Sequence, residues 1–213
     1  MRHAGERSFA GAQDGDTERG LVMYIDAFKR YPVIETSRIL IREMEPADAN
    51  DIFEYAKDSD SFVFTDGFPS ELDEVKFMIN IWKTEAYESK QFIRWSIVLK
   101  ADNKVIGGIY LFEPVGNDES GYRMDIGFEI SSKYWNKGYA SEAIEAVSRY
   151  AIQNMGVIRV QAQIVPENIG SIKACEKAGF INEGTLRNYC HYARNGNVLK
   201  TMVMMSRTPE DIA

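Results

Sequence analysis

The sequence predicts an α+β (α/β-like) domain with a mixed sheet, and three observations lead to that prediction. Runs rich in β-branched and aromatic residues, such as 92–100 and 157–165, are typical of strands. Other stretches repeat apolar residues at helical spacing, most clearly 138–154. In chain order the runs read β-α-α-β-β-β-α-β-α-β-β, so about seven strands and about four helices are expected in one domain over 37–207.

The segments outside that domain are short. Residues 1–20 mix four glycines with charged and small polar residues, so we expect a disordered leader, either native or introduced with an expression vector. Residues 21–36 are expected to form a short helical or extended N-terminal segment that docks on the domain or on a partner chain. Residues 208–213 are expected to be a C-terminal tail.

The first half of the domain begins with a strand at Arg38–Arg42. Pro46 then opens a helix through about Lys57, because proline is tolerated in a first turn. A second helix over 71–88 carries its apolar residues on one stripe.

Three strands follow, at 92–100, 104–112 and 122–131. The first two are joined by Ala101–Asn103, a good hairpin turn. We expect 114–121, which contains a proline and two glycines, to be a loop.

The second half alternates helices and strands. The 138–154 helix is stopped by Gly156, and a strand over 157–165 leads to a short helix capped by Asn168. Two more strands complete the domain, at 180–186 and 199–206.

Composition excludes several classes of function. A net charge of −7 and a pI near 5.0 argue against a nucleic-acid partner but fit cationic ligands such as amines. No segment approaches the ~20 apolar residues of a membrane span, so no membrane association is expected. Two cysteines and two histidines without metal-ligand spacing predict no metal site, and reduced thiols favour a cytoplasmic location.

The turn between the 122–131 strand and the 138–154 helix is the first candidate binding site. Gly138 allows a close backbone approach, and the first N–H groups of a helix attract an anion such as a phosphate. Lys137 adds a cation. The alternative is an ordinary turn beside a solvated lysine.

A second candidate is Asn168 with Ser171, at the start of the next helix. Both side chains would point at whatever lies between the two helices. The alternative is a helix cap and a surface serine.

Together these segments resemble the GNAT acetyltransferase superfamily. Trp135–Ala140 stands where that superfamily has the pyrophosphate loop Q/R-x-x-G-x-G/A, and 168–180 matches N-x-x-S…E-K-x-G-F. Tyr134–Ala143 and Thr36–Arg42 look most like the branch of ribosomal-protein-alanine N-acetyltransferases, with Y-W-x-K-G-Y-A-x-E-A and T-x-R-L-x-L-R. The resemblance covers about residues 35–207.

The resemblance implies a GNAT fold, with a central mixed, mostly antiparallel twisted sheet, and acetyl-CoA as co-substrate without a metal. The strand edge at Glu129-Ile130-Ser131 would pair with the pantetheine amides, and Asn168 and Ser171 would contact the pantetheine arm near the thioester. The pyrophosphate would be held by the backbone of Asn136, Lys137, Gly138, Tyr139 and Ala140.

The resemblance also implies direct attack of an amine on the acetyl thioester. Glu129 is the first candidate for the general base, since a carboxylate partly buried beside a cofactor has a raised pKa. The alternative is a glutamate that faces solvent or pairs with Arg94 or Arg123.

Two positions depart from the superfamily pattern. Cys175 stands where many members have a tyrosine acid, so Ser171 is the candidate that hydrogen-bonds the leaving thiolate. Trp135 opens the loop in place of Gln or Arg, which changes a side-chain contact and leaves the backbone donors intact.

The predicted function is therefore an N-acetyltransferase, a monomer or homodimer, that acts on a protein N-terminus or a small amine. Residues 62–68 and 85–92 would line the acceptor groove or belong to the core and its rim. The alternative is an acetyl-CoA-binding regulatory protein without turnover.

Overall fold

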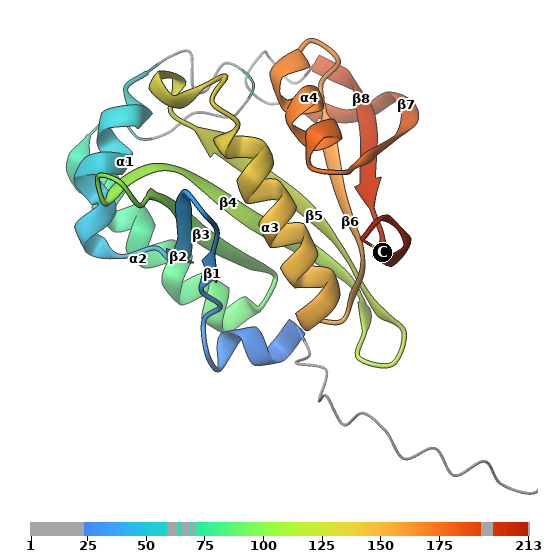
Figure 1. The fold of residues 1–213 in the computed structure, drawn as a ribbon, viewed down its shortest axis with the longest axis horizontal. Helices are drawn as coiled ribbons and strands as arrows, with labels where there is room; N and C mark the ends of the chain where they lie inside the picture. Colours follow the sequence, from blue (N-terminus) through green and yellow to red (C-terminus); the bar gives the residue numbers. More distant parts are fainter. Residues whose placement is uncertain (1–23, 59–63, 65–68, 70, 193–197, 213) are drawn as a thin grey trace, which may run out of the picture.

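The computed structural model describes residues 24–58, 64, 69, 71–192 and 198–212. Its centre is an eight-stranded sheet in the order β1-β2-β3-β4-β5-β6-β8-β7 (Figure 1). The strands are β1 (Ile34–Glu35), β2 (Ile39–Glu43), β3 (Phe92–Leu99), β4 (Lys104–Asn117), β5 (Gly121–Ile130), β6 (Val157–Ile164), β7 (Ile181–Tyr192) and β8 (Val198–Arg207). The α-helices of the described residues are α1 (Ala49–Ala56), α2 (Leu72–Ser89), α3 (Tyr139–Asn154) and α4 (Ile169–Lys177).

Neighbouring strands are antiparallel except for β5 and β6, which α3 connects as a parallel pair. The predicted α+β class with a mixed, mostly antiparallel sheet and four helices is thus confirmed. The strand that the sequence did not predict is β1, whose two residues are too few to show a period.

The prediction of a loop over 114–121 is wrong, because β4 continues to Asn117 and only 118–120 form the turn. The ladder breaks between Phe112 and Val115, where Glu113 has a positive φ of 52°. Such a bulge accommodates Pro114, which has no N–H to give to the ladder.

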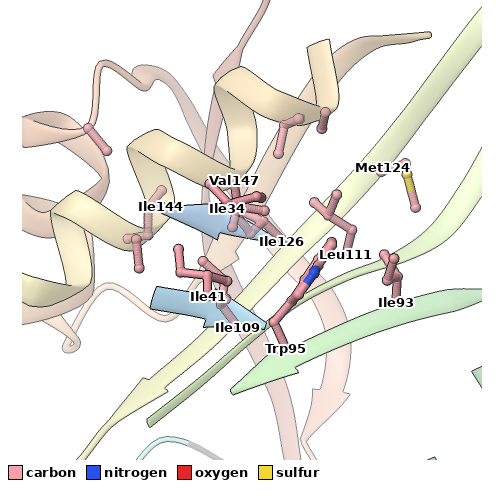
Figure 2. Packing of buried hydrophobic residues seen from close by; sticks show 14 of the residues in the cluster. Ile34, Ile41, Ile93, Trp95, Ile109, Leu111, Met124, Ile126, Ile144 and Val147 are labelled. Atoms are coloured by element: carbon pink, nitrogen blue, oxygen red, sulfur yellow. The ribbon is translucent and has the colours of Figure 1, made fainter. Parts of the chain in front are cut away.

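The two faces of the sheet are covered differently. Figure 1 shows α3 lying across one face, and Figure 2 shows Ile144 and Val147 of α3 among sheet residues such as Ile41, Ile109 and Ile126. On the other face, α1 and α2 pack a smaller cluster against β2, β3 and β4. Among the helices that the structure describes, none combines the length and apolar character needed to cross a membrane.

The described part of the N-terminal segment docks on this domain. A 3₁₀-helix spans Tyr24–Phe28, and the Tyr24 hydroxyl donates to the Lys90 carbonyl at 2.8 Å. The Trp95 indole N–H donates to the Pro32 carbonyl at 2.9 Å. Residues 1–20, the predicted leader, lie outside the described residues.

The feature that positions the site is the short contact between β5 and β6. Their parallel pairing runs from Tyr122 opposite Val157 to Asp125 opposite Gln161, and no further along the described strands. The rest of β5, through Ile130, therefore has an open edge on that side. The N-termini of α3 and α4 both face this opening.

Candidate functional site

A cavity of about 490 Å³ lies between the end of β5 and the first turns of α3 and α4. It has the size of a typical small-molecule site. Two of the predicted residues are not on its wall, namely Ser131 and Lys137. It brings together the others: Glu129, Ile130, Asn136, Gly138, Tyr139, Ala140, Asn168 and Ser171.

The turn before α3 is built to present its backbone. Asn136 and Gly138 have positive φ values of 58° and 80°, a region that glycine enters without strain. Gly138 is the N-cap of α3, so the following N–H groups have no acceptor inside the helix. With the helix dipole they form a site for an anion.

Two cations flank this turn. A Cβ placed on Gly138 would lie 3.5 Å from Arg38 Nη2 and 3.5 Å from Lys177 Nζ. Lys177 lines the cavity, a role that its place in the E-K-x-G-F motif did not predict. Arg38 is also paired with Glu142 at 2.5 Å and donates to the Lys137 carbonyl at 2.8 Å, so it both holds the turn and adds positive charge beside it. Together with Lys177 it suits a phosphate-bearing ligand at the turn.

The side chain of Lys137, in contrast, is engaged elsewhere. Its ammonium donates to the Lys133 carbonyl at 3.0 Å and lies 5.2 Å from the centre of the Tyr134 ring. Ser131 is buried, and its N–H donates to the Ile106 carbonyl. The backbone of Lys137 remains part of the turn.

Trp135 has a structural explanation for its atypical place in the loop. Its indole N–H donates to the carbonyl of Ile130 at 2.7 Å, at the open edge of β5. The ring lines the cavity and is 45% exposed. Trp135 therefore fixes the turn to the strand.

The start of α4 forms the facing wall. Asn168 Oδ1 accepts the N–H of Ser171 at 3.1 Å, which confirms the predicted cap. Cys175 points away from the cavity into the core, where burial raises the pKa of its thiol to about 12. At neutral pH this thiol stays protonated and packs as an apolar side chain.

Glu129 forms an ion pair with Arg94, one of the alternatives that the sequence left open. Burial raises the pKa of Glu129, and the positive charge of Arg94 opposes that rise. The guanidinium also lies over the rings of Trp82 and Tyr110, at 4.3 and 4.7 Å. A Cβ at Gly108, opposite Glu129, would require the Glu129 carboxylate to shift from its place beside Arg94.

A second cavity of about 250 Å³ opens where β5 and β6 diverge. It shares Phe64, Phe128, Asn168 and Ser171 with the first cavity, so the two meet at these residues. Of the predicted groove residues, Phe64 lies on both walls, whereas Phe62, Asp66 and Phe68 lie outside the described residues. Residues 85–92 are on neither wall.

Comparison with known proteins gives a family match. The family model described as an acetyltransferase (GNAT) domain matches residues 38–181. An uncharacterized N-acetyltransferase, p20 of Bacillus licheniformis, is 31% identical over 157 residues, which are 72% of this chain and 85% of that protein.

Solved structures match over most of the chain. An acetyltransferase (GNAT family) from Bacillus anthracis has a TM-score of 0.70 at 27% identity, and the match covers 84% of this chain and 99% of that one. Ribosomal-protein-S5-alanine acetyltransferase from Vibrio fischeri has a TM-score of 0.69 at 17% identity, with 84% and 98% covered. RimJ of Mycobacterium smegmatis, in complex with CoA-disulfide, has a TM-score of 0.69 at 16% identity, with 82% and 83% covered. The last two share the fold with this chain.

Proposed function

The chain belongs to the GNAT acetyltransferase family, and on that premise we propose that it transfers the acetyl group of acetyl-CoA directly to a primary amine. When bound, acetyl-CoA supplies an activated acetyl thioester. The observation that carries the proposal is the first cavity, which joins the Gly138 turn to Asn168 and Ser171.

The residues of that cavity suit the parts of acetyl-CoA. The turn at 136–140, with Arg38 and Lys177 beside it, offers N–H donors and positive charge to a pyrophosphate. The edge of β5 at Ile130 and the polar side chains of α4 would hold the pantetheine arm. A structural neighbour, RimJ of M. smegmatis, was solved with CoA-disulfide, and this supports a CoA ligand here.

The acceptor is a protein N-terminus or a small amine. The V. fischeri neighbour is a ribosomal-protein-S5-alanine acetyltransferase, and this supports a protein N-terminus as the acceptor. The free thiols of Cys175 and Cys190 are consistent with a reducing compartment such as the cytoplasm.

Two residues are proposed for the chemistry. Ser171, where the two cavities meet, would donate a hydrogen bond to the leaving thiolate, the role that Cys175 cannot take from inside the core. Glu129 is the proposed base, and its raised pKa favours that role. The ion pair with Arg94 gives Glu129 a second, structural role.

The proposal is tested by measuring free CoA release from acetyl-CoA with a panel of amines and a peptide with a free N-terminal alanine. We expect release with at least one acceptor. Binding of acetyl-CoA in calorimetry without turnover on any acceptor would instead support the regulatory alternative.

Replacing Ser171 by alanine is expected to lower kcat about tenfold, because one hydrogen bond to a charged leaving group is lost. The affinity for acetyl-CoA should change less than threefold, since the Ser171 N–H that Asn168 caps is kept. Steady-state kinetics and calorimetry measure the two quantities. An unchanged kcat would remove Ser171 from the mechanism.

Replacing Trp135 by phenylalanine is expected to weaken acetyl-CoA binding about threefold to tenfold. The ring is kept, but the hydrogen bond that ties the turn to Ile130 is lost, at a cost of about 1 kcal/mol. Calorimetric titration measures the Kd. An affinity equal to wild type would mean that the turn holds its shape without this bond.

A further inference from the structure

The second cavity has an acidic and aromatic wall. Its two carboxylates are Asp125 and Glu113, and among the described residues that line it none is basic. The rings of Tyr110, Phe112 and Phe128 also line it. Carboxylates combined with aromatic faces attract a cation and repel an anion.

Asp125 is held at the point where β5 and β6 part. It accepts hydrogen bonds from Gln161 Nε2 at 2.8 Å and from Gln163 Nε2 at 2.5 Å. Arg123, itself one-third exposed, reaches it at 3.2 Å, while the Asp125 side chain is only 3% exposed. Its buried negative charge is therefore met by two neutral amides and by the ion pair with Arg123.

Such a carboxylate is costly to bury unless a cation approaches it. Burial raises the pKa of Asp125, the bonds from Gln161 and Arg123 lower it, and the nearby charge of Glu113 raises it again. A ligand ammonium in the cavity would add a second positive charge, beside that of Arg123, and would further offset the cost of burial. It would also lie beside Ser171 and Asn168, which both cavities share.

We propose that this second cavity binds the acceptor as its ammonium ion, that Asp125 and Glu113 are the residues that select it, and that acceptors with a carboxylate next to the amine are rejected. The inference rests on the proposed acetyl transfer for its biological meaning. It defines the acceptor class as amines without an adjacent anion, such as arylalkylamines, amino-acid amides and peptide N-termini. Free amino acids fall outside that class.

The test uses two ligands that differ only by a carboxylate, 2-phenylethylamine and L-phenylalanine, titrated into the CoA-loaded protein by calorimetry. We expect 2-phenylethylamine to bind at least about tenfold more tightly, because the second ligand brings an anion to two carboxylates. Binding is measured without turnover, so the result does not depend on catalysis.

Three variants assign the effect to residues. Asp125→Asn should weaken 2-phenylethylamine binding roughly tenfold to a hundredfold, as expected for a hydrogen bond to a charged group. Glu113 is exposed, so the Glu113→Gln protein should fold normally. We expect its affinity for 2-phenylethylamine to fall by about twofold to fivefold. Asp102→Asn, in the exposed β3–β4 turn, is the control and should match wild type.

The outcomes are separable. Equal binding of the two ligands, no binding of 2-phenylethylamine, or wild-type binding by both Asp125→Asn and Glu113→Gln would each overturn this inference. If the amine binds as expected but no acceptor releases CoA, the inference about the cavity stands and the proposed acetyl transfer fails. If Asp125→Asn does not fold, Glu113→Gln and the ligand pair still decide.

Discussion

Gly138→Glu is expected to weaken acetyl-CoA binding by more than about a hundredfold, measured as Kd by calorimetry. Gly138 has a φ of 80°, so any side chain there is strained, and its Cβ would point between Arg38 and Lys177. A glutamate would bring its own carboxylate to these two cations and to the N-terminus of α3. It would thereby occupy the charges proposed for the pyrophosphate and repel a second anion.

Gly138→Ala is the matched control for backbone strain. It carries the unfavourable φ, at a cost of about 1 kcal/mol in stability, but adds no charge. Its acetyl-CoA affinity should stay within about tenfold of wild type. If Gly138→Glu bound acetyl-CoA as well as Gly138→Ala does, the proposed position of the cofactor would be wrong.

Glu129→Gln is expected to lower the free energy of unfolding by about 3–5 kcal/mol, measured by urea denaturation. The side chains of Glu129 and Arg94 are only 5% and 10% exposed, so the substitution removes a buried negative charge that pairs with the guanidinium. The matched control is Asp73→Asn, which breaks the exposed ion pair with Lys76 and should cost less than about 1 kcal/mol.

A double variant separates the charge from the packing. Arg94→Met with Glu129→Leu removes both charges and should be more stable than either single variant, because neither charge remains buried alone. The proposed base role adds a kinetic expectation. At a temperature where Glu129→Gln is folded, kcat should fall by about a hundredfold or more. If Glu129→Gln lost stability but kept the kcat of wild type, Glu129 would have a structural role in its ion pair and would not be the base.

Local patterns predicted the parts of this protein that depend on local forces. The start of a helix near Gly138, the cap at Asn168 and the hairpin at Ala101–Asn103 follow from residue types at fixed spacing, and the structure has each of them. The same rules failed at 114–121, because pairing with β5 overrides the turn-forming tendency of Pro114 and Gly116. The pairing of one strand with another cannot be predicted from a segment of eight residues alone.

The candidate site likewise has a part that the sequence predicts and a part that only the fold brings together. The Gly138 turn is one continuous segment, so its motif could be recognised in the sequence. Lys177 reaches it from α4, and the Asp125 carboxylate gains its partners Gln161 and Gln163 only when β5 meets β6. Residues 36 or more positions apart share a site through the topology, and no single pattern in the sequence records that.

The short pairing of β5 with β6 also divides the sheet into two groups of strands. Strands β1 to β5 form one group and β6 to β8 the other, and the ladder between them has four residue pairs, from Tyr122–Val157 to Asp125–Gln161. Helix α3 packs against both groups. Because Asn168 and Ser171 follow β6 and line both cavities, a substitution along this seam is expected to alter cofactor and acceptor binding together.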